Sequence, residues 1–291
     1  MSDQDRYIPG VPCWIDTTQP DPEAAVAFYG DLFGWEFEDV MPPGSPGRYY
    51  VARIGGGDVA AVGSQPEGAP MAVWNTYVRV TDADETAARV RAAGGTVLRE
   101  PDDVGDAGRM AVFADPAGAA FCVWQAREHR GAAVVNEHAS LNFNDLHTRD
   151  VHGAQSFYGS VFGWETLDLG PGHMWALPGY GDFLEQRNPG MRERMAQMGA
   201  PERFEDVVAS LNSISDDEPG VAAHWGLTFA VDDADAIAGR AAELGGRVVV
   251  PPFDAPWVRM TIITDPQGAT FTASRFVPEN KSLEESAGAA R

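Results

Sequence analysis

The feature that most constrains the fold of this sequence is an internal repeat. Residues 28–36 read Phe-Tyr-Gly-Asp-Leu-Phe-Gly-Trp-Glu and residues 157–165 read Phe-Tyr-Gly-Ser-Val-Phe-Gly-Trp-Glu, so seven of nine positions agree at a spacing of 129. Acidic helix starts recur at Asp82 and Asp233, and Asp-Pro-x-Gly turns recur at Asp115 and Asp265. Three landmarks in one order indicate a tandem duplication. The length of 291 residues also suits about two domains.

Each repeat contains two units in which a strand, a helix and further strands follow one another. In the first unit, strand-like residues 11–18 precede Asp21-Pro22, a capping residue followed by proline at the first helical position, and Gly34 ends the helix. We predict a first domain at 1–128 (modules 8–66 and 71–126), a linker at 129–138 and a second domain at 139–278. The second copy is about 22 residues longer, which predicts an insertion at about 183–223 with two short helices. Residues 279–291 are small and polar, and we expect a disordered tail.

Composition excludes several classes of partner. The formal net charge of −22 would repel nucleic acid and anionic membranes at long range. The sequence shows no secretory signal and no bilayer-spanning stretch, and its two cysteines, Cys13 and Cys122, do not form a disulfide framework. We therefore expect a cytoplasmic protein, monomeric or homodimeric, whose partner is a small molecule.

These motifs, twice over and in this order, resemble the vicinal oxygen chelate superfamily, which includes glyoxalase I, bleomycin-resistance proteins and extradiol dioxygenases. The resemblance covers about nine-tenths of the chain and implies an α+β fold of four βαβββ modules. Pairs of modules would form two tandem domains, each a cupped, open mixed sheet with helices outside and a ligand cavity inside.

The resemblance also implies where metal ligands would stand. Metal-dependent members place His, Glu or Gln about seven residues before each acidic helix start and about seven after the Asp of each Asp-Pro-x-Gly turn. These positions hold Trp14, Asn75, Phe143, Gly226, Cys122 and Thr272. We therefore expect no metal and no other cofactor. Asp16, Asp145 and His224 would share the inward face by strand alternation, but one acid per domain is far short of a coordination set.

Strand alternation instead predicts an aromatic cavity with a few polar groups, as is usual for small-molecule sites. The candidate ligand-binding residues are Trp14, Asp16, Asn75, Tyr77, Arg109, Trp124, Phe143, Asp145, His224, Trp257 and Arg259. Two alternatives stay open. The aromatic side chains could simply fill the barrel, and Arg109 and Arg259 could be ion-pair partners of Asp16 and Asp145 instead of anchors for an anionic ligand. We regard Cys122 as a buried structural cysteine.

Three functions are compatible with these features. The first is a metal-free protein that binds or sequesters an organic metabolite, as bleomycin-resistance proteins do. The second is a glyoxalase-like lyase or isomerase, or an oxygenase, acting on a small carbonyl or aromatic substrate. The third is a scaffold that works through protein contacts at the insertion.

Overall fold

The computed structural model describes residues 6–65, 68, 71–168, 173–217 and 219–282. The first repeat contains β1 (Pro12–Gln19), α1 (Pro22–Phe33), β2 (Glu36–Asp39), β3 (Tyr49–Ile54), β4 (Gly57–Ser64), β5 (Val73–Arg79), α2 (Ala83–Ala92), β6 (Thr96–Val104), β7 (Gly108–Ala114) and β8 (Ala120–Ala126). The second repeat contains β9 (Ser140–Thr148), α3 (Val151–Phe162), β10 (Glu165–Asp168), β11 (His173–Ala176), α4 (Tyr180–Arg187), α5 (Met191–Gln197), η1 (Phe204–Asp206), β12 (Val207–Ser213), β13 (His224–Ala230), α6 (Ala234–Glu243), β14 (Arg247–Ala255), β15 (Val258–Thr264), β16 (Thr270–Phe276) and η2 (Pro278–Ser282).

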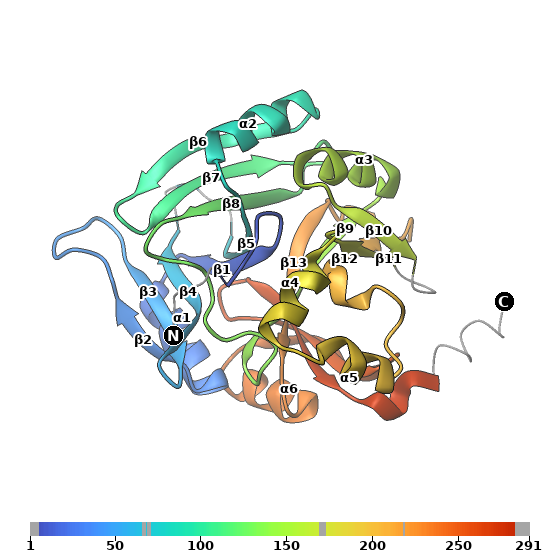
Figure 1. Ribbon diagram of the computed structural model, residues 1–291. Helices are drawn as coiled ribbons and strands as arrows, with labels where there is room; N and C mark the ends of the chain where they lie inside the picture. The colour runs from blue at the N-terminus through green and yellow to red at the C-terminus, as the bar shows by residue number, and fades with distance from the viewer. Residues whose placement is uncertain (1–5, 66–67, 69–70, 169–172, 218, 283–291) are drawn as a thin grey trace. The chain divides into compact units, whose positions relative to one another are not determined.

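The strands form two sheets with the same connectivity (Figure 1). The first has the order β2-β3-β4-β1-β5-β8-β7-β6 and the second β10-β11-β12-β9-β13-β16-β15-β14. In each module the first strand pairs in parallel with the last, as β1 does with β4, and the other pairs are antiparallel. The predicted α+β fold of four βαβββ modules in two mixed sheets is confirmed.

The second repeat departs from its predicted outline in two places. The two short helices expected in the insertion are present as α4 and α5, but the range 183–223 also contains β12, which lies between β11 and β9 in the sheet. The additional chain is therefore shorter than predicted. The disordered tail was predicted at 279–291, but Pro278–Ser282 forms a 3₁₀-helix. Residues 283–291 lie outside the described part of the chain.

Contacts divide the chain into two compact units, and each unit takes elements from both repeats. The first comprises the described residues within Met1–Cys13, Thr76–Gly131 and Asn144–Trp225, and the second those within Trp14–Asn75, Ala132–Phe143 and Gly226–Arg291. These units differ from the predicted sequence domains, whose boundaries stay a prediction. In the parts of the chain that the structure covers, no helix is both long and apolar enough to span a bilayer.

The core of the second unit is built around α1. Tyr29 is fully buried and its ring contacts Phe28, Trp35 and Phe271 at centroid distances of 5.0, 5.7 and 6.0 Å. Its hydroxyl donates to Asp265 Oδ2 at 2.8 Å. The repeated motif of the first copy is thus packed against the Asp-Pro-x-Gly turn of the second copy.

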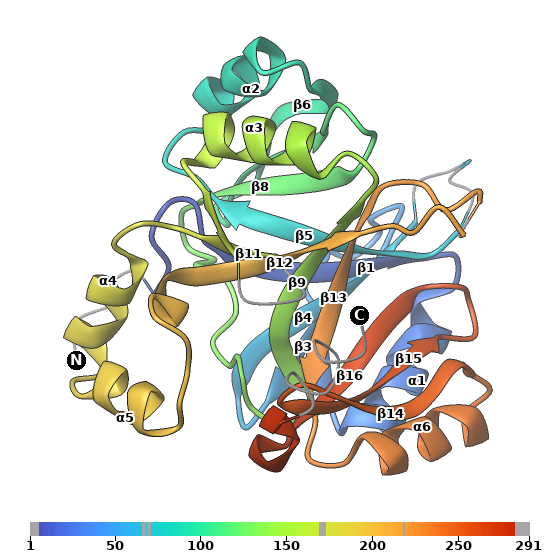
Figure 2. The same ribbon diagram turned by 90° about the vertical axis from the view of Figure 1, so that its right-hand side faces the viewer.

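The core of the first unit repeats this arrangement with the copies exchanged. Tyr158 of α3 is fully buried beside Phe121 of β8 at 5.6 Å, and its hydroxyl donates to Asp115 Oδ2 at 3.1 Å. In Figure 2, α2 and α3 lie side by side over β8. The recurrence of both motifs therefore has a structural cause, because each helix tyrosine bonds the turn aspartate of the other repeat.

Both helices begin and end as their sequences predict. The Asp21 side chain accepts from Ala24 N at 2.9 Å, Pro22 stands at the first helical position, and Gly34 ends α1 in the left-handed conformation with φ 71°. Helix α3 ends in the same way at Gly163 with φ 75°. These caps fix where each chain segment leaves its helix and enters the next strand.

Candidate functional site

Strand alternation separates a helix-facing side of the strands from an inward side, as predicted. Ile15 is fully buried in the core that surrounds α1, and Phe121 contacts three rings of α3. Leu146 on β9 is also fully buried. Their sequence neighbours Asp16 and Asp145 therefore lie on the opposite, inward side of β1 and β9.

In the second unit, three predicted site residues meet at one carboxylate. Asp16 Oδ1 accepts from Asn75 Nδ2 at 2.8 Å, and its Oδ2 accepts from Tyr49 OH at 3.0 Å. Trp14 Nε1 donates to the same Tyr49 hydroxyl at 3.1 Å. We call Trp14, Asp16, Tyr49 and Asn75 the Asp16 cluster. Asp16 and Trp14 are each only 3% exposed, whereas Tyr49 and Asn75 are half-buried.

The inward residues of β5 and β8 in the first unit are also tightly packed. The rings of Tyr77 and Trp124 form an edge-to-face pair at 6.5 Å, and Trp124 Nε1 donates to His129 O at 2.8 Å. Burial raises the pKa of the Cys13 thiol on β1 to about 12, so that group is inert as a nucleophile at neutral pH. Cys122 is buried as predicted. Here the aromatic side chains fill space.

The second repeat places a more accessible set of polar groups on β9, β12 and β13, within the first unit. Asp145 Oδ1 accepts from Ser210 Oγ at 2.7 Å, and Ser210 Oγ accepts from Asn212 Nδ2 at 3.0 Å. Asn212 stands opposite His147 in the parallel register, and the His147 ring stacks on His224 at 4.8 Å with 5° between the planes. We call Asp145, His147, Ser210, Asn212 and His224 the Asp145 cluster.

The remaining candidates are held elsewhere. Arg109 forms a bidentate ion pair with Asp84 at 2.9 and 3.0 Å, and Arg259 does the same with Asp235 at 2.6 and 2.8 Å. The alternative in which these arginines pair with Asp16 and Asp145 is therefore wrong, because each arginine bonds the first turn of its own module's helix. These carboxylates in turn raise the pKa of both guanidinium groups above the usual range.

Trp257 lies in the turn between β14 and β15. Its φ is 67°, its ring stacks on Phe276 at 6.2 Å and 5°, and the Lys281 ammonium lies 5.0 Å from its centroid. These contacts hold the C-terminal 3₁₀-helix on the hairpin. Phe143 on β9 is half-buried in the second unit.

Equivalent inward positions differ sharply in size between the repeats. The spacings of 129, 150 and 151 give four pairs, first copy before second: Trp14 and Phe143, Asn75 and Gly226, Tyr77 and Thr228, Trp124 and Ser274. The first copy carries the larger side chain in every pair. Asp16 is buried whereas Asp145 is half-buried and His224 is exposed. By these exposures, Asp145 and His224 are more accessible than Asp16.

The residues at the implied metal positions do not fit a divalent ion. Trp14, Phe143 and Gly226 provide no side-chain ligand atom, and the Asn75 amide is turned toward Asp16. Across the residues that the structure describes, no group of three or more His, Cys, Asp or Glu side chains converges as an ion would require. The side chains at these positions therefore do not supply the ligand atoms that metal-dependent members of the superfamily use.

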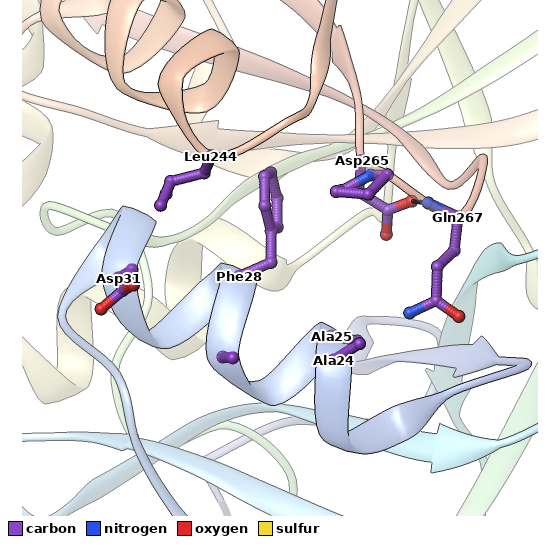
Figure 3. A pocket seen from close by; sticks show the side chains of 9 residues that line it. Ala24, Ala25, Phe28, Asp31, Leu244, Asp265 and Gln267 are labelled. Atoms are coloured by element: carbon purple, nitrogen blue, oxygen red, sulfur yellow. Dashed lines mark hydrogen bonds between the residues drawn. The ribbon is translucent and has the colours of Figure 1, made fainter.

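A cleft of about 310 Å³ lies on the helix side of the second unit, away from both clusters. Figure 3 shows Phe28 and Asp31 of α1 facing Leu244, Asp265 and Gln267 across it. The Asp265 carboxylate accepts from Tyr29, Gln19 and the backbone of Gln267 and Ala269. Because those bonds fix the turn, we assign this cleft to packing between elements and not to chemistry.

Sequence reasoning missed Tyr49, His147, Ser210 and Asn212. His147 was available, since it lies two residues after Asp145 on the same strand face. Ser210 and Asn212 were hidden because β12 was assigned to the insertion. Tyr49 begins β3, a strand for which no inward face was predicted.

The family model of the Glyoxalase/Bleomycin resistance protein/Dioxygenase superfamily matches residues 14–123 and 138–272. The chain belongs to this superfamily. The Mycobacterium tuberculosis protein named "Putative glyoxylase CFP32" is 37% identical over 285 residues, covering 96% of this chain and 100% of that protein. The "Anthracycline biosynthesis protein DnrV" of Streptomyces peucetius is 36% identical over 282 residues, covering 92% and 94%.

Solved structures support the fold. The Mn(II)-bound glyoxalase from Novosphingobium aromaticivorans has a TM-score of 0.58 at 15% identity and covers 92% of this chain and 82% of its own. The 2,3-dioxygenase LapB from Pseudomonas sp. KL28 has a TM-score of 0.57 at 14% identity and covers 92% and 93%. At these identities the likeness concerns the architecture alone.

Proposed function

We propose that this protein binds or sequesters a small organic metabolite at the Asp145 cluster, without the metal ion of metal-dependent superfamily members. The observation that carries the proposal is the contrast between the two clusters. The Asp16 carboxylate is 3% exposed and accepts from Asn75 and Tyr49, whereas Asp145, His147 and Asn212 are half-buried and His224 is exposed. Convergent polar groups beside aromatic rings are typical of small-molecule sites.

Two further facts support a small molecule as the partner. The names of the relatives, a glyoxylase and an anthracycline biosynthesis protein, both refer to the chemistry of small organic molecules. The net charge of −22 disfavours nucleic acid and anionic membranes at long range. We therefore propose a cytoplasmic protein, monomeric or homodimeric, that is not directed at either of those partners.

The second candidate is a glyoxalase-like isomerase or lyase, and one observation favours it. His224 Nδ1 lies 2.9 Å from Ala222 O, and because a carbonyl oxygen only accepts, Nδ1 must carry the hydrogen. The neutral ring then keeps its lone pair on Nε2, as a general base requires. In this candidate His224 removes a proton from the bound molecule.

Metal analysis combined with a ligand screen tests the proposal. Purified wild type is dialysed and analysed for nickel, zinc, iron and manganese, and a metabolite library is screened by thermal shift against wild type, Asn212→Leu and Asp16→Asn, each relative to its own baseline. We expect no stoichiometric metal. We also expect stabilising compounds whose effect is lost in Asn212→Leu and retained in Asp16→Asn, since a ligand stabilises only the state that binds it.

Two results would overturn the proposal. One is a stoichiometric transition metal that survives dialysis. The other is a set of stabilising compounds whose shifts respond to Asp16→Asn but not to Asn212→Leu. Turnover of a bound compound that disappears in His224→Ala would instead favour the isomerase or lyase.

A further inference from the structure

Two phenyl rings are exposed on neighbouring parts of one sheet. Among the Phe, Trp and Tyr side chains in the described ranges, two are exposed: Phe253 of β14 at 38% and Phe276 of β16 at 54%. Isolated exposed apolar residues are common, whereas a contiguous exposed apolar patch marks a binding surface. The question is therefore whether these two rings belong to one patch.

The strand register joins them. Strands β14, β15 and β16 lie side by side (Figure 2), with Met260 of β15 paired with Phe253 and Val258 of β15 paired with Phe276. Met260 and Val258 are two residues apart, so they share one face of β15 between the two rings, and both are half-buried. Directly paired side chains are about 5 Å apart. One small molecule can therefore contact all four side chains, which we call the Phe253 patch.

One wall of the Phe253 patch is held in place from behind. Trp257 stacks on Phe276 at 6.2 Å with 5° between the planes, and the Lys281 ammonium lies 5.0 Å from the Trp257 ring centroid. The Trp257 carbonyl accepts from Val277 N at 2.7 Å. Trp257 also has φ 67°, a conformation that is costly for a bulky side chain. The fold thus tolerates local strain at the residue that supports the Phe276 ring.

The charged groups of the same hairpin are on the other face. Arg259 donates to Asp235 of α6 and to Asp254 of β14. Strand alternation places the sequence neighbours Met260 and Phe253 on the opposite face. The patch is therefore apolar, and a charged group brought onto it would lose hydration without gaining a partner. This favours an uncharged ligand.

The size of the patch distinguishes a small molecule from a second protein. A phenylalanine side chain offers about 200 Å², so exposures of 38% and 54% leave about 180 Å² open on the two rings. A stable protein interface takes about 800 Å² from each partner. The open area instead matches what one aromatic ring buries.

The spacing of the strands sets the shape of that molecule. Strands two apart in a sheet are separated by about 10 Å, and a flat ring between two others needs about 7 Å between their planes. The width between Phe253 and Phe276 therefore suits one planar ring system, with Met260 and Val258 as the floor beneath it.

The first repeat lacks this patch. By the spacing of 150, Ala126 stands at the position of Phe276. Asp102 pairs with Met110, the counterpart of Met260, so a carboxylate takes the place of the first phenyl ring. The fold itself therefore does not require aromatic side chains at these positions.

We propose that the Phe253 patch is a binding site for an uncharged planar aromatic group, stacked between Phe253 and Phe276 over Met260 and Val258. The site belongs to the second unit, whereas the Asp145 cluster belongs to the first. This inference goes beyond the proposed function, and either can fail without the other.

Three matched probes test the inference by calorimetry and ligand-observed NMR on the full-length protein. The planar, neutral probe is 2-naphthol, decahydro-2-naphthol keeps the hydroxyl but not the flat ring, and 2-naphthoate adds a negative charge. Phe253→Leu and Phe276→Leu remove a ring but keep an apolar side chain, and Phe253→Tyr keeps the ring. Leu98→Ala is the control, because Leu98 is a 57% exposed apolar residue on β6 of the first repeat.

We expect 2-naphthol to bind wild type at least about fivefold more tightly than decahydro-2-naphthol, because only the flat ring stacks. Binding of 2-naphthoate should be weaker than that of 2-naphthol. Phe253→Leu and Phe276→Leu should each weaken 2-naphthol by about two- to tenfold, the range of an aromatic pair. Phe253→Tyr should retain wild-type binding, and Leu98→Ala should leave it unchanged. Both phenyl rings are exposed, so these variants should fold normally.

Several results would overturn the inference. They are equal binding of the saturated probe, 2-naphthol binding that neither leucine variant weakens, and no binding at millimolar concentration. Binding that is lost in Asn212→Leu but kept in Phe253→Leu would place the probe at the Asp145 cluster instead. Sedimentation that shows a dimer dissociated by Phe253→Ser would assign the patch to a second copy of the chain. Binding that appears only in a variant ending at Ser282 would show that the chain's own C-terminal residues cover it.

Discussion

The substitution Tyr29→Phe isolates one hydroxyl on which the second unit depends. That hydroxyl donates to Asp265 Oδ2 at 2.8 Å and accepts from Trp74 Nε1 at 3.1 Å. Phenylalanine keeps the ring and therefore the contacts with Phe28 and Trp35. The effect of the change should thus report the hydrogen bonds and not the loss of packing.

The magnitude follows from the two bonds. A hydrogen bond to a charged group contributes about 1.5–3 kcal/mol, and a buried donor left without an acceptor costs at least about 1 kcal/mol. Because Tyr29 is fully buried and Asp265 is 4% exposed, water cannot replace the hydroxyl. We expect the free energy of unfolding to fall by about 3 kcal/mol, which corresponds to a decrease of about 6 °C or more in Tm.

The assay is urea denaturation followed by tryptophan fluorescence and circular dichroism. Tyr50→Phe is the matched control, because its hydroxyl donates to Glu23 at 3.2 Å on the exposed surface, and it should change stability by less than about 0.5 kcal/mol. A double-mutant cycle with Asp265→Asn should give a coupling energy of about 1 kcal/mol or more. If Tyr29→Phe is as mild as Tyr50→Phe, the bond between the repeats does not stabilise the unit and our reasoning is refuted.

Three further predictions concern a backbone clash at a glycine, a buried carboxyl group and a buried indole. Gly131 has φ 103° and an added Cβ would lie 2.4 Å from Cys13 O, whereas Gly118 has φ 94° with open space around it. In urea denaturation, Gly118→Ala should lower the free energy of unfolding by about 1 kcal/mol, and Gly131→Ala should lower it several times more. Equal losses in the two variants would argue against the clash. Burial raises the pKa of Asp115, so the folded state binds its proton more tightly than the unfolded chain does. That contribution to stability is present below the ordinary carboxyl pKa of about 4 and is lost as pH rises through the raised value, so wild type should lose stability relative to Asp115→Asn across this window in urea titrations; a gain would contradict the assignment. Trp14→Ala should cost about 3–5 kcal/mol because its indole is 3% exposed, and a near-neutral result in thermal unfolding would show that its side chain lines an open cavity.

Much of the fold could be predicted from local signals. Asp21 with Pro22, and the left-handed Gly34, are determined by backbone chemistry over a few residues, and the observed caps agree. The repeated landmarks predicted four modules in two sheets because duplication copies the whole pattern. Strand alternation also placed Asp16 and Asn75 on one face, where they bond at 2.8 Å.

The sequence by itself thus determined the modules, the faces of the strands and the absence of His, Glu or Gln at the implied metal positions. Only the tertiary structure decided which residues meet across long separations. Tyr29 bonds Asp265 over 236 positions, and His224 stacks on His147. The physical reason is that alternation fixes which way a side chain points, whereas the pairing register of distant strands and the packing of helices fix what it touches.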